Sequence, residues 1–277
     1  MPDPHPPAPR TRLAARDLAA GHGGRTVIEG LDLEIPDGSF TVIVGPNACG
    51  KSTLLHTLAR VLARRAGTVL LDGADIARLP SKQVARTLGL LAQQPVTPEA
   101  ITVADLVSRG RHPHRRPLRG WTAEDEDAVA RALAATDTAA LAERPVDELS
   151  GGQRQRVWLA MVLAQETPIL LLDEPTTFLD IAHQIDVLDL CAGLHEDRDR
   201  TLVAVLHDLN HACRYATHLV AMRDGAVVAQ GPPADVATPE LIEAVFGLPC
   251  EVVPDPVTGT PLVVPLSRRH VRHATGT

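Results

Sequence analysis

Short apolar runs alternate with longer helix-forming stretches through most of this chain. The runs rich in Val, Ile, Leu and Ala are "FTVIV" (40–44), "ILLL" (169–172), "TLVAVL" (201–206) and "HLVAM" (218–222). Runs of this length and composition are typical of strands buried on both faces. The stretch "KSTLLHTLARVL" (51–62) follows the first run and has the composition of a helix. Strands that alternate with helices predict an α/β fold built on a parallel sheet.

The two ends of this region carry strand and turn signals instead. "TVIEGLDLEI" (26–35) is rich in strand-forming residues and runs into the turn sequence "PDGS". Near the other end, "AMRDGAVVAQG" (221–231) predicts a hairpin with Asp224-Gly225 as its turn. "CEVVPDPVTGTPLVVP" (250–265) predicts a second hairpin. Antiparallel pairs are therefore expected beside the parallel sheet.

A middle region of different composition predicts an insertion. From about residue 95 to 165 the chain is rich in Ala, Arg and Asp, and "TAEDEDAVARALAATDTAALAE" (122–143) favours helix. The polar ends, 1–10 and 267–277, are expected to be disordered tails. This leaves residues 11–266 as one α/β domain with a helical insertion at about 95–165.

Composition excludes several functional classes. The chain has 277 residues and a net charge of −7, so it has no overall attraction to nucleic acid, and with 2% aromatic residues it has few platforms for stacking bases. Its four cysteines have no C-x-x-C spacing and are expected to be reduced thiols in a cytosolic protein. No signal peptide and no apolar run long enough to span a membrane are present in this sequence. A membrane role would therefore require a partner.

"GPNACGKST", Gly45 to Thr53, has the P-loop pattern G-x-x-x-x-G-K-[ST] in the required place, after a strand and at the start of a helix. Backbone N–H groups of such a loop surround phosphates, and the helix N-terminus adds a favourable potential. Lys51 is expected to reach the β- and γ-phosphates and Ser52 to bind Mg²⁺. The ATP-binding residues predicted here are Gly45, Pro46, Asn47, Ala48, Cys49, Gly50, Lys51, Ser52 and Thr53.

The strand "ILLL" delivers two carboxylates to its C-terminal end, the edge where ligands bind in open α/β sheets. Asp173 is placed to bind Mg²⁺, and Glu174 is placed to take a proton from the attacking water. In isolation, such a pair would more often be a solvated loop. Beside a P-loop, the catalytic interpretation is favoured.

A second anion-binding helix start lies about a hundred residues beyond the P-loop. "LSGGQ" (149–153) places a favourable N-cap, Ser150, before two glycines and a helix whose apolar positions repeat at helical spacing. Together with the P-loop, Gln93 in "LLAQQP", Asp173-Glu174, "FLD" (178–180) and His207 in "AVLHDLN", it resembles the ordered motif set of ATP-binding-cassette (ABC) ATPases. The resemblance covers about residues 11 to 265. It implies a P-loop NTPase cassette with a parallel-sheet core, an antiparallel β subdomain and an inserted α-helical subdomain.

This resemblance explains why one chain has two anion-binding helix starts, the P-loop and the signature. In that family two cassettes pair head to tail, and each ATP lies between the P-loop of one and the signature of the other. A second cassette, expected to be identical, is thus a predicted partner. The residues that would contact the partner's ATP are Ser150, Gly151, Gly152, Gln153 and Asp180. For Asp180, helix N-capping is the simpler alternative.

The resemblance also implies catalytic roles for two further residues. Gln93 would contact Mg²⁺ and the attacking water, so the expected Mg²⁺ ligands are Ser52, Gln93 and Asp173. His207 would contact the γ-phosphate, and with Glu174 and Gln93 it completes the predicted catalytic set. Without this context, a His at a strand end is more often a core residue.

Two positions in or near the P-loop carry separate expectations. Family members place an aromatic ring, commonly Tyr, against adenine, and "AAGHGGRTV" has His22 there. Because imidazole offers less stacking area, ATP is expected to be only modestly preferred over GTP. Cys49, near a helix N-terminus, is expected to have a lowered pKa and a reactive thiol. Simple packing of that thiol is an equal alternative.

Within the family the chain looks most like the ATPases of bacterial iron–siderophore, haem and vitamin B12 importers. This likeness rests on "GRHPH" (110–114), "TTFLDIAHQ" (176–184), "LHDLNHACRYATHL" (206–219) and "DPVTGTPLVVP" (255–265). It implies a membrane permease as a direct partner, a substrate-binding protein as an indirect one, and a peripheral position on the cytoplasmic face of the membrane. Ferric siderophores are the preferred cargo, with haem, cobalamin or a non-transport role as alternatives.

Other ATPase classes fit less well. A DNA-repair or structural-maintenance ATPase would carry long heptad coiled coils, a translation-factor ATPase would carry two cassettes, and a P-loop kinase would lack "LSGGQ". One basic stretch remains unassigned, with five Arg between Arg109 and Arg119. It is either a solvated loop or a surface that faces the permease or anionic lipid.

Overall fold

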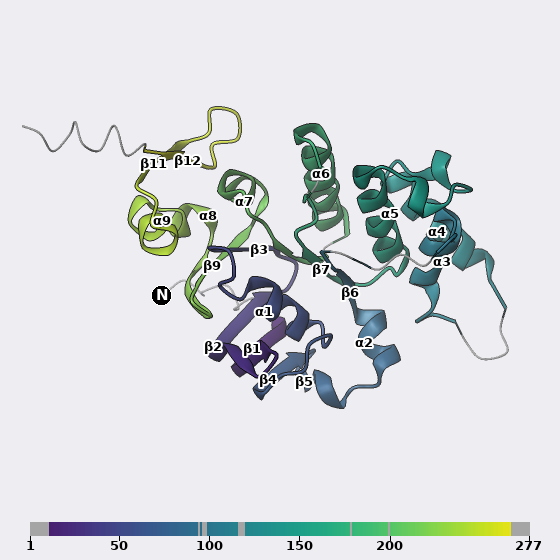
Figure 1. Cartoon of the computed structure of the whole chain (residues 1–277), viewed down its shortest axis with the longest axis horizontal. Helices are drawn as coiled ribbons and strands as arrows, with labels where there is room; N and C mark the ends of the chain where they lie inside the picture. The colour runs from purple at the N-terminus through teal and green to yellow at the C-terminus, as the bar shows by residue number, and fades with distance from the viewer. Residues whose placement is uncertain are drawn as a thin grey trace, which may run out of the picture.

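The computed structural model of the chain describes residues 11–93, 95, 99–115, 120–177, 179–198 and 200–266. The two predicted tails and Phe178 lie outside these residues. Figure 1 shows a core of sheets with helices on both sides, a separate group of helices at one end and a small hairpin at the other. The described strands form sheets of six, four and two strands.

The six-stranded sheet has the order β10-β9-β3-β8-β7-β6. Its five strands from β9 to β6 run parallel, and β10 pairs antiparallel with β9 through the predicted Asp224-Gly225 turn. Every residue of β3, β7 and β8 is buried, as their apolar sequences require. The predicted parallel α/β core is confirmed. Its strands are β3 Phe40–Val44, β6 Leu88–Leu91, β7 Ile169–Asp173, β8 Thr201–Val205, β9 His218–Arg223 and β10 Ala226–Gly231.

An antiparallel sheet of order β2-β1-β4-β5 covers one side of this core. Its strands are β1 Thr11–His22, β2 Arg25–Pro36, β4 Ala66–Leu71 and β5 Ala74–Asp75. Helix α1, Lys51–Leu58, contacts β1 and β2 as well as β7 and β8, so it lies between the two sheets. It ends four residues before the predicted helix, at Leu58. Alternate residues of the parallel strands, such as Ile43, pack on this side.

The other face of the parallel sheet is covered by helices. Helices α3, α4 and α5 contact one another (Figure 1). In the sequence they lie between β6 and β7, where the insertion was predicted. The helix predicted over 122–143 is shorter in the structure: α4 ends at Ala135, and a 3-10 turn follows it. The inserted helices are α3 Val103–Ser108, α4 Ala123–Ala135 and α5 Gly151–Ala164, and α6 Ile181–Arg198 follows β7. Helix α2, Ser81–Thr87, precedes β6 instead, and its Val84 packs on the side of α1. The described residues also include 3-10 turns at Ile76–Arg78, Arg109–Arg111, Ala139–Leu141 and Val146–Glu148.

The last described part packs on the far end of the sheet. Its apolar contacts join α7 and α9 to the predicted second hairpin, with Cys213, Ile242, Cys250 and Val263 buried among them. These elements are α7 Leu209–Tyr215, α8 Pro233–Val236, α9 Pro239–Phe246, β11 Cys250–Pro254 and β12 Pro261–Pro265. This hairpin is far along the chain from the P-loop and buries little of the main core.

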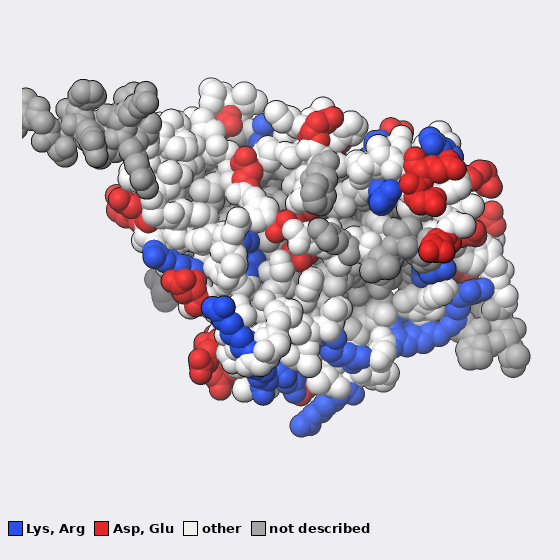
Figure 2. Space-filling model, in the orientation of Figure 1, with Lys and Arg blue, Asp and Glu red and all other residues white. Residues whose placement is uncertain are grey.

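Charge is unevenly distributed over the surface. Figure 2 shows Asp and Glu gathered over the end that holds the inserted helices, and Lys and Arg along the lower edge, over α2 and the end of the four-stranded sheet. Although the net charge is −7, one edge of the surface is therefore rich in basic residues.

Candidate functional site: a P-loop cavity

Four neighbouring parallel strands deliver the predicted nucleotide-binding and catalytic residues to one edge of the sheet. β3 runs into the P-loop, β6 leads to Gln93, β7 ends at Asp173 and Glu174, and β8 leads to His207. Because the strands are adjacent and parallel, their carboxyl ends lie side by side. The chain thus brings together residues that are more than a hundred positions apart.

The P-loop is shaped by close backbone contacts at its start. Gly45 has φ of 156°, and a Cβ there would lie 2.2 Å from the Met222 carbonyl oxygen, so only glycine fits. Helix α1 begins after Gly50 with no side-chain cap and no acidic residue in its first turn. Its first amides and the positive end of the helix dipole are therefore available to an anion.

Lys51 is buried at the centre of this loop. Its Nζ donates hydrogen bonds of 2.9 Å to the carbonyl oxygens of Gly45 and Pro46. These bonds hold the ammonium group at the loop, and no carboxylate of the described residues forms an ion pair with it. A phosphate group bound there would meet a preplaced positive charge.

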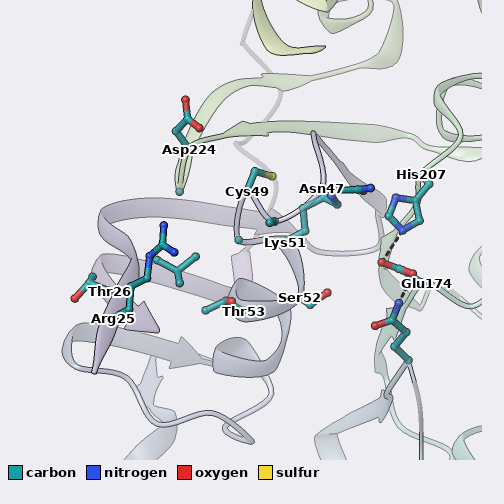
Figure 3. A pocket seen from close by; sticks show the side chains of 15 residues that line it. Arg25, Thr26, Asn47, Cys49, Lys51, Ser52, Thr53, Glu174, His207 and Asp224 are labelled. Carbon is teal, nitrogen blue, oxygen red and sulfur yellow. Dashed lines mark hydrogen bonds and ion pairs between the residues drawn. The ribbon is translucent and has the colours of Figure 1, made fainter. Parts of the chain in front are cut away.

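The P-loop lies in an open cavity of about 780 Å³. In Figure 3, Glu174 and His207 stand at one end, the P-loop residues lie in the middle, and Arg25, Thr26 and Asp224 stand at the other end. The residues that line it are Arg25, Thr26, Val27, Asn47, Ala48, Cys49, Gly50, Lys51, Ser52, Thr53, Gln93, Glu174, His207, Asp224 and Gly225. A cavity of this size accommodates a nucleotide.

The oxygen groups at the start of α1 and at the end of β7 fit a magnesium ion. Ser52 Oγ donates a 2.9 Å hydrogen bond to Asp173 Oδ1. Asp173 Oδ2 is buried without a hydrogen-bond partner in the described structure, and His56 Nε2 is 3.0 Å away without hydrogen-bond geometry. Mg²⁺ binds hard oxygen ligands and typically takes only one or two from protein, with phosphates and water completing the shell. Among the described residues no cluster of three or more His, Cys, Asp or Glu is placed to hold a metal ion.

Glu174 is held by three side chains at the catalytic end of the cavity. Its Oε1 lies 2.6 Å from His207 Nε2, and its Oε2 accepts hydrogen bonds from Gln93 Nε2 and, at 3.1 Å, from Thr177 Oγ1. The backbone of Glu174 has φ of 51°, a strained value for a residue other than glycine. Gln93, Glu174 and His207 therefore meet in space as the predicted catalytic set.

The signature residues lie elsewhere. Ser150 caps α5 by accepting a hydrogen bond from Gln153 N, while the Gln153 side chain accepts one from Ser150 N. Ser150 and Gly151 are exposed, and neither they, Gly152 nor Gln153 line the P-loop cavity. A role for this helix start in ATP binding would need a nucleotide brought by another chain.

Asp180 is also exposed and outside the cavity. Its Oδ1 accepts a 3.0 Å hydrogen bond from His183 N and lies 2.7 Å from His183 Nδ1. Hydrogen bonds from the His183 backbone and ring hold the pKa of Asp180 below its usual value. Within this single chain, Asp180 makes the helix-capping contact of the simpler alternative.

His22 and Arg25 lie on opposite sides of a two-residue turn, and the structure places Arg25 in the cavity. His22 is exposed and does not line the cavity; its Nε2 is 3.4 Å from Thr53 Oγ1. Arg25, Asp224 and Thr177 were not among the site residues predicted from the sequence. Arg25 could have been found, because residues that flank a two-glycine hairpin turn face the same way.

The expected lowered pKa of Cys49 is wrong. Burial raises the pKa of the thiol, and this outweighs the opposing effects of Lys51 and of backbone N–H groups. The Cys49 Sγ lies against the loop, only 2.9 Å from where a Cβ on Gly45 would be. Proximity to a helix N-terminus does not compensate for loss of water around the thiolate.

Cys49 should therefore react slowly with maleimide at pH 7, because its thiolate is scarce and its side chain is buried. We expect slow labelling both without nucleotide and with Mg-ATP. Peptide mass spectrometry identifies the labelled site, and complete labelling of all four cysteines in denaturant is the control. Rapid labelling that ATP suppresses would contradict this expectation.

The basic stretch is only partly a surface feature. Arg111 is buried and donates to Asp125 Oδ1 and Glu166 Oε2, both at 2.9 Å, and to the Ala164 carbonyl at 3.0 Å. Burial alone would raise the pKa of Asp125, but hydrogen bonds from Arg111 and Thr122 outweigh it and hold that pKa below its usual value. Arg115 is exposed over Trp121, and residues 116–119 lie outside the described structure. Arg111 is thus a buried residue that links its own segment to the C-terminal end of α5.

Comparisons with known proteins agree with this geometry. Residues 28–177 match the ABC transporter family, and they contain the P-loop, the signature and Asp173-Glu174. The chain belongs to the ABC transporter ATPases. It is 58% identical over 257 residues to the ferric enterobactin transport ATP-binding protein FepC of Escherichia coli, covering 93% of this chain and 95% of the relative. It is 54% identical to the probable siderophore transport system ATP-binding protein YusV of Bacillus subtilis, covering 92% and 93%.

The fold of this ABC ATPase is similar to that of a solved structure. The dimeric post-hydrolysis structure of the ATP-binding cassette MJ0796, bound to ADP and Pi, superimposes with a TM-score of 0.70 at 26% identity, covering 79% of this chain and 98% of that one. As an ABC ATPase the protein binds and hydrolyses ATP, and such subunits function as dimers with a membrane permease. Within the described residues, no helix is both long and apolar enough to cross a membrane.

Proposed function

We propose that this protein is the ATP-hydrolysing subunit of a bacterial importer for ferric siderophores. The observation that carries this proposal is the 58% identity to a ferric enterobactin transport ATPase along nearly the full length of both chains. ATP hydrolysis by the cassette would drive a separate permease that receives its cargo from a substrate-binding protein.

The subunit would act as one of two identical cassettes on the cytoplasmic face of the membrane, held there by the permease. The placement of Ser150, Gly151 and Asp180 on the surface, outside the P-loop cavity, supports a shared ATP site. Each cassette would bind ATP on its own P-loop and complete the partner's site with Ser150, Gly151, Gly152, Gln153 and Asp180.

The catalytic proposal follows from the contacts of Glu174. Its carboxylate would take a proton from the water that attacks the γ-phosphate. Gln93, Thr177 and His207 all contact this carboxylate and would keep it oriented. His207 would also contact the γ-phosphate, and Lys51 with the first amides of α1 would bind the β- and γ-phosphates.

Ser52, Asp173 and Gln93 would hold Mg²⁺ at the phosphate end of the cavity. When bound, the ion supplies positive charge that offsets the charge of the phosphates. The 2.9 Å bond between Ser52 and Asp173 already places two oxygen ligands together.

Uptake of radiolabelled iron tests the cargo directly. In a host strain that lacks this gene, ferric siderophore uptake should be lost, restored by the natural gene and not restored by a Glu174→Gln gene. Haem and cobalamin uptake, measured in the same strains, should not change. If uptake of haem or cobalamin fails while ferric siderophore uptake persists, the cargo assignment is wrong.

A further inference from the structure

The P-loop fixes where the two ends of a bound nucleotide must lie. Glu174 and His207 stand beyond the P-loop on one side, where the γ-phosphate is attacked (Figure 3). The nucleoside must then extend towards the opposite end. That end is lined by Arg25, Thr26 and Val27 on one wall and by Asp224 and Gly225 on the other.

Both walls of this end are firmly anchored. Gly225 N donates a 2.9 Å hydrogen bond to the Cys49 carbonyl, and a Cβ on Gly225 would lie 2.1 Å from the Val27 carbonyl oxygen. On the other wall, Arg65 donates to the Gly24 carbonyl at 2.8 Å and to Thr26 Oγ1 at 3.1 Å. The turn that carries Arg25 is therefore fixed relative to the P-loop.

Strand register orients Arg25 together with His22. The two residues are the last pair of the β1–β2 ladder before the Gly23-Gly24 turn, so their side chains share one face of the hairpin. On that face the His22 ring contacts Thr53 of the P-loop, and Arg25 continues along the cavity wall. His22 thus lies against Thr53, and Arg25 is the member of the pair that lines the cavity.

The Arg25 guanidinium has no ion-pair or hydrogen-bond partner within the described ranges. Every other arginine between residues 11 and 93 has at least one polar partner. A guanidinium is planar and stacks on aromatic faces, a contact that becomes stronger as water is excluded. A nucleobase that enters this end of the cavity would offer such a face.

We propose that Arg25 forms the platform for the nucleobase of ATP, with its guanidinium plane against the base, and that His22 positions the hairpin through Thr53. This inference rests on the proposed function, because it takes ATP as the nucleotide of this cavity. Stacking does not read the hydrogen-bonding edge of a base, so this assignment likewise predicts only a modest preference for ATP over GTP. Arg25 is a binding residue in this assignment and takes no part in the cleavage of the phosphate bond.

Titration of the full chain with ATP and with inorganic tripolyphosphate, both with Mg²⁺, tests the assignment. Arg25→Ala should weaken ATP binding about 5- to 30-fold and leave tripolyphosphate binding within about twofold. Arg25→Tyr removes the charge but keeps a flat surface, so it should retain ATP affinity within about threefold. Arg16→Ala is the matched control, because Arg16 lies on the same hairpin, pairs with Glu34 and does not line the cavity.

Other outcomes would overturn the assignment. An equal loss of ATP and tripolyphosphate binding in Arg25→Ala would show that Arg25 contacts phosphate. Unchanged ATP binding in the same variant would show that Arg25 does not contact the bound nucleotide. A selective loss of ATP binding in His22→Ala, with none in Arg25→Ala, would make His22 the platform. An ATP preference of a hundredfold or more over GTP would show that another residue reads the base edge. If the natural chain binds neither ATP nor tripolyphosphate, the proposed function itself fails, which is a distinct result.

Discussion

Glu174→Gln should bind Mg-ATP and hydrolyse it about 10²–10⁴-fold more slowly than the natural chain. Glutamine keeps the length and planar shape of glutamate, but it cannot take a proton from the attacking water. The site is already built around the carboxylate, which contacts His207, Gln93 and Thr177 at the carboxyl end of β7. Release of inorganic phosphate measures the rate, and retained nucleotide binding controls for folding. A rate within tenfold of the natural chain would remove Glu174 as the general base.

The same variant tests whether two chains share each ATP. With hydrolysis blocked, bound ATP should persist and hold the Ser150 region of an opposing chain, so Glu174→Gln should run as a dimer with Mg-ATP and as a monomer with ADP on size exclusion. Adding Ser150→Arg should restore the monomer without loss of ATP binding, because a long side chain would occupy the γ-phosphate position. A double variant that still dimerises with ATP would rule out the shared site.

A matched control separates this effect from the loss of a helix cap. Thr122 caps α4 through the same kind of reciprocal contact, with Asp125, that Ser150 makes with Gln153. Thr122→Arg in the Glu174→Gln background removes a helix cap from the same helical region, and each cap contributes about 1 kcal/mol to the stability of the fold. That protein should still dimerise with Mg-ATP.

Lys51→Ala should weaken ATP binding by about 10- to 100-fold, because a buried, preplaced ammonium group makes charge-assisted hydrogen bonds to phosphate. Within the described part of the chain it bonds to the neutral carbonyls of Gly45 and Pro46 and to no carboxylate, so its charge is available to the ligand. Titration with a fluorescent ATP analogue measures the change. Lys82→Ala, which removes an exposed lysine on α2, should bind normally. An unchanged dissociation constant for Lys51→Ala would show that the P-loop does not bind the phosphates.

Some expectations failed for a common reason. Cys49 follows a sequence pattern that lowers thiol pKa values, yet its pKa is raised because neighbouring segments exclude water from it. Arg111 belongs to a stretch that reads as a basic loop, yet it is buried because Asp125 and Glu166 reach it from other parts of the chain. In both cases the deciding neighbours are remote in sequence.

The sequence by itself determined the parallel strands, the P-loop, the signature helix start and the carboxylates after β7. Each of these depends on residues close together in the chain: a run of apolar residues buries a strand, and a glycine-rich turn exposes amides. Only the tertiary structure decided that Arg25, and not His22, lines the cavity, and that Thr177 joins Gln93 and His207 in contact with Glu174. These arrangements depend on strand order and register, which bring separate strand ends and hairpin faces within hydrogen-bond distance. Burial and the exact contacts between distant segments are properties of the packed chain, so a local pattern can nominate such residues but cannot decide which of them meet.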